Sequence, residues 1–340
     1  MEQRQHHVQV IGAGSIGNRH IRCLLATGRA RVSVVEVNAD LRVAIARQYA
    51  GVAIHESLEI ALADGRPDAA VIATPAPLHV AQATRLASRG IHLLIEKPLG
   101  VSLEGVDELQ AAVRRSGVVA AVGYVYRAHP VLNELREALA SGAYGRPVEL
   151  VAVCGQHFPH YRPAFRQTYF ARHDTGGGAV QDALTHIVNA GEWLVGEIER
   201  VVADTAQQVL EGVEVEDTAH VLARHAGGLP ASYNLNQHQA PDEITITVVC
   251  DRGTLRFEYH ANRWRSMTSP GGEWTNYVGG TADSDTMFVR QAHAFLNAVE
   301  GRAAPLCTLD EGAATLRVNL AILASARGGC WQSTTCAGAP

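Results

Sequence analysis

Lys97, Asp182 and His186 have the residue types and spacing that proton transfer requires. Asp182 and His186 are four residues apart in a segment of helical periodicity, so we expect them on one helix face, with Cβ atoms within about 6 Å. A histidine that titrates near neutral pH can accept a hydroxyl proton as hydride leaves the neighbouring carbon. Lys97 would hydrogen-bond the same oxygen and stabilise its developing charge. The predicted chemistry is alcohol oxidation or ketone reduction.

Each of these residues also has an ordinary structural explanation. His186 would be a hydrogen-bonded core histidine, Asp182 a local cap, and Lys97 a surface charge. Lys97, however, directly precedes Pro98 at the carboxyl end of a predicted strand, where open α/β sheets bind their ligands. This position favours the catalytic interpretation.

A bound dinucleotide that could accept the hydride is predicted by a glycine motif. Gly12, Gly14 and Gly17 form G-x-G-x-x-G between a predicted strand and a predicted helix. This motif places a pyrophosphate on the helix N-terminus. Glu36 ends the second strand 19 residues after Gly17, where an acid binds the adenosine ribose and repels the extra phosphate of NADP. We therefore expect NAD rather than NADP. The alternative to a dinucleotide-binding motif is a glycine-rich turn followed by a surface glutamate. Arg42, on the next helix, is expected on a solvated face.

The elements that must position these residues fall into two domains. Residues 1–125 alternate apolar runs with helical patterns, which predicts an α/β Rossmann domain. The strands are expected at 8–11, 32–37, 69–73, 91–95 and 118–122, and the helices at 16–26, 39–49, 78–88 and 103–115. Residues 126–330 predict an α+β substrate-binding and oligomerisation domain with a mostly antiparallel open sheet, and 331–340 a tail. The strands of this second domain are expected at 148–153, 201–210, 218–224, 231–235, 244–250 and 254–259. Its helices are expected at 130–140, 179–195, 287–299 and 311–324.

Further motifs resemble those of the Gfo/Idh/MocA family of oxidoreductases. They are Thr74-Pro75 with His79, then Glu96-Lys97-Pro98, and finally Gly176-Gly177-Gly178 followed by Asp182 and His186. The resemblance extends from about residue 8 to 326. It implies an active site where the E-K-P turn meets the D-x-x-x-H helix, with the three glycines letting backbone approach the nicotinamide. It also implies a homodimer or homotetramer formed through the open sheet.

The resemblance and the glycine motif together nominate the following cofactor-binding residues: Gly12, Gly14, Ser15, Ile16, Gly17, Glu36, Thr74, Pro75, His79, Glu96, Lys97 and Arg127. The stretch Tyr124-Val125-Tyr126-Arg127 departs from many family members, which carry phenylalanine and asparagine before the arginine. A polar and aromatic stretch from Gln156 to Tyr169 is nominated for substrate binding, through His157, Tyr161, Arg162 and Arg166. A loop that covers a neighbouring subunit would explain the same composition.

Composition narrows the remaining classes. The formal charge of -5 comes from scattered charges, so neither nucleic acid nor an anionic membrane is an expected partner. No apolar leader or membrane span is found, and we expect the protein in the cytoplasm. The six cysteines show no C-x-x-C spacing, although Cys330 and Cys336 lie near each other in the tail. No metal-binding helix motif appears, so no metal is expected.

These observations predict an NAD-dependent dehydrogenase or reductase. Its substrate is expected to be a secondary alcohol or ketone on a sugar, a sugar derivative or inositol. Two alternatives stay open: a glycoside-oxidising enzyme that acts at a ring hydroxyl, and a non-catalytic NAD-binding regulator on the same fold. The presence of Lys97 and His186 argues against the regulator.

Overall fold

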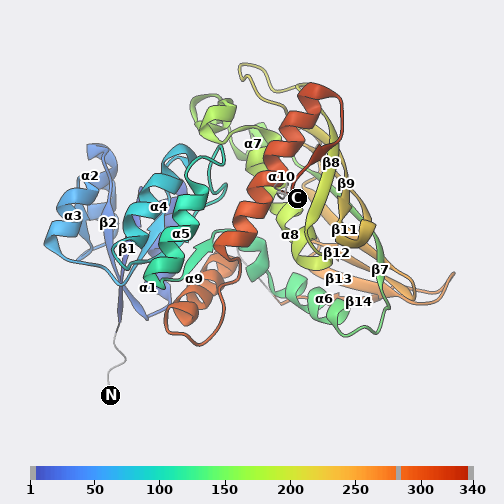
Figure 1. Cartoon of the computed structure of the whole chain (residues 1–340), viewed down its shortest axis with the longest axis horizontal. Helices are drawn as coiled ribbons and strands as arrows, with labels where there is room; N and C mark the ends of the chain where they lie inside the picture. Colours follow the sequence, from blue (N-terminus) through green and yellow to red (C-terminus); the bar gives the residue numbers. More distant parts are fainter. Residues whose placement is uncertain (1–4, 281–284, 336–340) are drawn as a thin grey trace. The chain divides into compact units, whose positions relative to one another are not determined.

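The computed structural model describes residues 5–280 and 285–335. This chain divides into two compact units (Figure 1). The first is built from the chain up to Ala128 together with a later segment that ends at Ala313. The second is built from residues 129–280 and 314–335.

The first unit contains a six-stranded sheet in which every pairing is parallel. The strand order is β3-β2-β1-β4-β5-β6, so the direction of winding reverses between β1 and β4, where open α/β sheets bind ligands. The predicted Rossmann fold is confirmed. The strands are β1 (His6–Ile11), β2 (Ala30–Val35), β3 (Ala53–His55), β4 (Ala69–Ile72), β5 (His92–Ile95) and β6 (Ala120–Val122).

Five helices connect these strands: α1 (Ser15–Ala26), α2 (Ala39–Gln48), α3 (Leu58–Asp64), α4 (His79–Ala87) and α5 (Val106–Ser116). The sequence predicted four of them and missed α3, together with β3. Both missed elements are short, and β3 has no fully buried residue. β3 therefore lacks the continuous apolar run that marks a strand buried on both faces, such as β4, and α3, with 7 residues, is too short to show a clear helical period.

Helix α9 (Thr286–Val299) belongs to the first unit, although in sequence it lies between the two segments that form the second. Its residues Ala292, Phe295 and Leu296 are buried in the same hydrophobic core as Val8 and Val10 of β1. Each unit is therefore built from two segments of the chain, whereas the sequence predicted a single boundary at residue 125. An amphipathic helix shows in its sequence which of its faces is apolar, but not which sheet that face covers.

The second unit contains a nine-stranded sheet of order β14-β13-β12-β11-β7-β10-β9-β8-β15. All pairings are antiparallel except that of β7 with β10, as the sequence predicted for most of the sheet. The strands are β7 (Pro147–Gly155), β8 (Ile198–Ala206), β9 (Thr218–His225), β10 (Pro230–Asn236), β11 (Glu243–Cys250), β12 (Gly253–Glu258), β13 (Arg263–Met267), β14 (Thr275–Val278) and β15 (Gln332–Ser333). The last three were not predicted.

Helices pack on this sheet and leave part of it open. Helix α6 (Pro130–Ala140) contacts β12 and β13, and α8 (Thr185–Val195) contacts β7; Figure 1 shows α8 beside the strands. Alternate residues of the central strands point away from the buried side. Among them, Val153 is 50% exposed and Leu222 is 56% exposed. The open sheet predicted from the sequence therefore has exposed apolar side chains.

The remaining helical elements are short, apart from α10 (Leu309–Gly328), which contributes to both units. They are α7 (Phe158–Tyr161) and the turns η1 (Ala76–Leu78), η2 (Val125–Ala128), η3 (Phe165–Gln167), η4 (Tyr169–Ala171), η5 (His173–Thr175), η6 (Val180–Leu184) and η7 (Ala226–Gly228). Unlike the others, η6 is a π-helical turn, and it leads directly into α8. The sequence predicted one uninterrupted helix at 179–195.

Four cysteines, Cys23, Cys154, Cys250 and Cys307, are buried free thiols, and Cys330 is an exposed one. Cys336 lies outside the described residues. Within residues 5–280 and 285–335, no helix is long and apolar enough to cross a membrane. The same residues contain no cluster of three His, Cys, Asp or Glu side chains that could hold a metal ion.

Candidate functional site

The glycine motif follows β1. Two of its positions must be glycine, because they leave no room for a side chain. Gly12 has a φ of +88°, and a Cβ atom there would lie 2.7 Å from the carbonyl oxygen of Ala73. A Cβ atom on Gly17 would lie 1.9 Å from the carbonyl oxygen of Gly12. These two glycines allow the loop to pack against the end of β4 and the first turn of α1.

The middle glycine of the motif, Gly14, faces open space instead. Among the described residues, leaving out Gly14 and its two chain neighbours, no atom lies within 4 Å of the position that a Cβ atom on Gly14 would take. Gly14 is the N-cap of α1 and supplies no side-chain acceptor to its first turn, which begins at the exposed Ser15 and includes Ile16. An uncapped helix start beside open space fits the pyrophosphate of a dinucleotide, because backbone N–H groups and the helix dipole both attract an anion.

Glu36 lies beside this loop, as the sequence predicted from its position after β2. Its carboxylate accepts hydrogen bonds from the N–H of Ala13 at 2.6 Å and of Asn38 at 2.8 Å. Arg42 does not point away into solvent as a helix-face residue would. Its guanidinium donates to the carbonyl oxygens of Glu36 at 2.9 Å and Val37 at 2.8 Å. The carboxylate of Glu36 is thus held by backbone N–H groups of the glycine loop and of Asn38, while Arg42 holds the backbone at Glu36 and Val37.

His79 joins the two turns that follow β4 and β5. One ring nitrogen lies 2.7 Å from the carbonyl oxygen of Thr74, and the other lies 3.0 Å from that of Pro98. The side chain is 1% exposed, and this burial lowers the pKa of His79 despite the two hydrogen bonds. Its position fixes the Thr74-Pro75 turn relative to the E-K-P turn.

Glu96 is buried next to Lys97 and accepts a hydrogen bond from His20 of α1 at 2.7 Å. Burial opposes its ionisation, but the hydrogen bond and charge of His20 and the charge of Lys97 hold the pKa of Glu96 below its usual value. Lys97 itself is partly buried, and its peptide bond to Pro98 is cis. His20 had no predicted role, because nothing in the sequence relates it to a residue 76 positions away.

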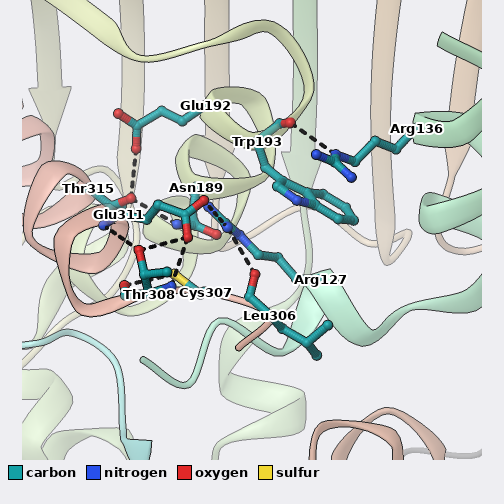
Figure 2. A network of polar contacts seen from close by, with 10 residues as sticks. All are labelled: Arg127, Arg136, Asn189, Glu192, Trp193, Leu306, Cys307, Thr308, Glu311 and Thr315. Carbon is teal, nitrogen blue, oxygen red and sulfur yellow. Dashed lines mark hydrogen bonds and ion pairs between the residues drawn. The ribbon is translucent and has the colours of Figure 1, made fainter. Parts of the chain in front are cut away.

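Arg127 has partners within the first unit (Figure 2). Its guanidinium donates to the carbonyl oxygen of Leu306 at 3.0 Å and forms an ion pair with Glu311. The side chain is 2% exposed. These contacts give Arg127 a structural role in addition to the cofactor contact that the resemblance implies.

In the second unit, Asp182 lies within η6 and His186 lies at the start of α8. Both are partly buried. The phenolic hydroxyl of Tyr169 donates to the Asp182 carboxylate at 2.6 Å, which fixes that carboxylate in one orientation. The sequence placed Tyr169 in the polar stretch without predicting this contact. Single π-helical turns recur at functional sites, where they change the direction in which side chains leave a helix.

Helix α8 is anchored to residues 314–328 of α10 by buried polar contacts. Asn189 donates to the Thr315 hydroxyl at 2.9 Å, and that hydroxyl donates to Glu192 at 2.6 Å (Figure 2). One turn away, Asn319 donates to the Thr185 hydroxyl at 2.8 Å. Because Thr185 adjoins His186, these contacts hold the backbone that carries the predicted base.

The four predicted substrate-binding residues, His157, Tyr161, Arg162 and Arg166, are all exposed. They lie around a small separate core that contains the buried Phe158, Phe165 and Phe170. Arg166 also donates to the carbonyl oxygen of Glu211 at 2.7 Å. The phenylalanines thus support a segment that presents polar side chains to solvent.

The fold and the glycine loop of the first unit define a dinucleotide-binding domain of the Rossmann class. Residues 6–124 match the oxidoreductase family with an NAD-binding Rossmann fold, and residues 132–256 match the GFO/IDH/MocA C-terminal domain. The chain belongs to the Gfo/Idh/MocA family of oxidoreductases.

The individual relatives share low sequence identity with this chain. A 1,5-anhydro-D-fructose reductase of Ensifer adhaerens is 27% identical over 70% of this chain and 71% of its own length. Levoglucosan dehydrogenase in complex with NADH and levoglucosan has a similar structure, with a TM-score of 0.89, 21% identity, and coverage of 98% of this chain and 100% of that one. The WlbA dehydrogenase of Bordetella pertussis, in complex with NADH and UDP-GlcNAcA, gives a TM-score of 0.85 at 26% identity and 99% coverage of both chains.

Proposed function

We propose that this protein is an NAD-dependent oxidoreductase that moves a hydride between nicotinamide and a secondary alcohol or ketone of a sugar, a sugar derivative or inositol. The observation that carries the proposal is the helix start in the second unit, where Tyr169 orients Asp182 four residues before His186. A carboxylate fixed near a histidine is the arrangement that a general base requires. The substrate class is supported by the relatives, whose names describe sugar reductases and dehydrogenases.

Each residue has a defined role in this proposal. Bound NAD supplies the nicotinamide ring that accepts or returns the hydride. His186 accepts the hydroxyl proton, Asp182 favours the charged form of His186, and Lys97 donates a hydrogen bond to the reacting oxygen.

The composition of the chain supports a specific role for Lys97. Among 29 lysine and arginine residues, it is the only lysine, so the chain uses arginine for its ordinary surface charges. An ammonium group differs from a guanidinium in that its pKa can be tuned and its donors rotate freely. Such a group suits an oxygen that changes from hydroxyl to carbonyl.

Residues around the glycine loop and the E-K-P turn would hold the cofactor: Gly12, Gly14, Ser15, Ile16, Gly17, Glu36, Thr74, Pro75, His79, Glu96, Lys97 and Arg127. We propose that Glu36 makes NAD the preferred dinucleotide. His157, Tyr161, Arg162 and Arg166 are proposed to contact the substrate, because they are exposed and carry hydrogen-bonding groups.

The function is tested by a panel of polyols, glycosides, keto-sugars and inositols, each assayed with NAD or NADH by nicotinamide absorbance. We expect turnover with at least one sugar or cyclitol, and product analysis would identify the oxidised carbon. Tight NAD binding without turnover of any compound would instead support the non-catalytic regulator.

We further propose that the protein is a homodimer or homotetramer that buries the open sheet face. Val153 and Leu222 are exposed there, and a second copy of the same face would cover them symmetrically. We expect light scattering at micromolar concentration to show an oligomer, and Leu222→Asp to shift it toward monomer. Val209→Asp is the matched control, because Val209 is 53% exposed but lies outside the sheet. A monomeric wild type would refute the proposal.

A further inference from the structure

The helix that carries Asp182 and His186 begins on a buried glutamate from another segment. Glu216 is 6% exposed, and its carboxylate accepts a hydrogen bond from the N–H of Val180 at 2.8 Å. Its backbone carbonyl accepts from the N–H of Ala179 at 3.0 Å. No side chain at the N-cap position of η6 makes such a bond. Glu216 therefore satisfies two donors that a helix otherwise leaves open at its start.

The position of Glu216 also explains part of the glycine run. Gly178 has a φ of +90°, and a Cβ atom there would lie 2.6 Å from the Glu216 carboxylate. A Cβ atom on Gly177 would lie 2.2 Å from the carbonyl oxygen of Phe170. The sequence predicted that these glycines give access to the nicotinamide. In the structure, glycine is required at both positions by packing within the second unit, because the helix start lies directly against Glu216 and the backbone of η4.

The second carboxylate oxygen of Glu216 is paired with His173, whose Nε2 lies 2.5 Å away. The side chain of Glu216 is 4% exposed and that of His173 is 41% exposed, so the pair extends from the helix start toward solvent. The hydrogen bond to Glu216 raises the pKa of His173 despite partial burial. Asp174 also raises this pKa, while Arg327 of α10 lowers it.

We propose that Glu216, paired with protonated His173, is a positioning residue that sets the register of the turn carrying Asp182 and His186. Asp182 lies two residues beyond Val180, and its carboxylate meets the Tyr169 hydroxyl at 2.6 Å. A slip of one residue rotates a helical side chain by about 100°, which would carry Asp182 away from Tyr169. This inference rests on the proposed function and adds a residue outside the motifs that the sequence displays.

The pairing makes the positioning depend on pH. Because the folded protein raises the pKa of His173 above its ordinary value of 6.5, the stability that the pair contributes is complete below that pH. It is lost as the pH rises through the raised pKa. Above that value Glu216 keeps the Val180 hydrogen bond but loses its charged partner.

The test compares Glu216→Gln with Glu214→Gln. Glu214 is exposed two residues earlier, and its substitution removes the same charge without touching the helix start. We expect Glu216→Gln to lower kcat about 10- to 100-fold with KM for NAD unchanged, since misplacement of catalytic groups by about 1 Å has effects of this size. We expect Glu214→Gln to behave as wild type.

Histidine NMR supplies a readout that needs no substrate. In Glu216→Gln, the pKa of His173 should fall toward 6.5 and the ring signals of His186 should move, whereas Glu214→Gln should leave both unchanged. Equal kcat values in the two variants, or an unmoved His186 signal, would overturn the proposal. If the wild-type enzyme turned over no sugar, the proposed function would fail while the NMR comparison still judged the positioning role.

A second variant applies if Glu216→Gln does not fold. His173→Gln leaves the carboxylate and its Val180 hydrogen bond in place. We expect kcat/KM of the wild type to fall as the pH rises through the pKa of His173, and this step to be absent in His173→Gln. An identical pH profile in both proteins would contradict the proposal.

Discussion

The Lys97→Ala and His186→Ala variants are each expected to lose about 10² to 10⁴ in kcat while still binding NAD. This is the range over which a positioned general acid or base contributes to rate. Both residues would act on the same oxygen, so the double variant should be little worse than either single one. Steady-state kinetics with the best sugar from the panel, and NAD titration by fluorescence, measure the two quantities.

Control variants separate these losses from general damage. Lys97→Arg keeps the positive charge but replaces an ammonium by a larger guanidinium, so we expect it to stay impaired. His260→Ala removes an exposed histidine of the second unit and should leave kcat unchanged. A kcat within about threefold of wild type for Lys97→Ala or His186→Ala would show that the assigned role is wrong.

The single lysine also permits a direct physical measurement. Protein labelled with lysine that carries ¹³C at Cε alone should give one side-chain signal, which reports on Lys97. We expect this signal to move when NAD binds and again when the substrate is added.

The wild-type enzyme is expected to prefer NAD, and Glu36→Ser to raise the ratio of kcat/KM for NADP to that for NAD at least about 100-fold. A buried carboxylate beside the extra phosphate costs several kcal/mol, and each 1.4 kcal/mol is about a factor of ten. We expect the guanidinium of Arg42, which donates to the carbonyl oxygen of Glu36, to supply the positive charge for that phosphate in the variant. Steady-state kinetics with both cofactors tests the ratio.

Glu59→Ser is the matched control, because Glu59 is an exposed carboxylate of α3 that pairs with Arg85. Its substitution should leave the cofactor ratio unchanged. Since Glu36 also accepts the Ala13 N–H, some loss of affinity for NAD is expected in Glu36→Ser. A wild type that uses both dinucleotides equally would reject the role of Glu36.

From the sequence alone, five of the six strands of the Rossmann sheet and four of its connecting helices could be predicted in their correct order. Parallel strands buried on both faces require continuous apolar runs, so β4 and β5 could be located from their runs of apolar residues. The glycine motif and Glu36 were also readable, because a turn between a strand and a helix fixes its residues over a short span. The separate family motifs nominated the residues that we propose to do chemistry.

Which distant segments of the chain meet could not be predicted from the sequence. Neither the packing of α9 on the core of β1 nor the bond between His20 and Glu96 has a local signal. The same is true of Glu216, which reaches Val180 across 36 residues and thereby helps to define the start of a helix. A periodic pattern reports which face of an element is buried, but the partner of that face, and the carboxylate that caps a helix from afar, depend on how the whole chain packs.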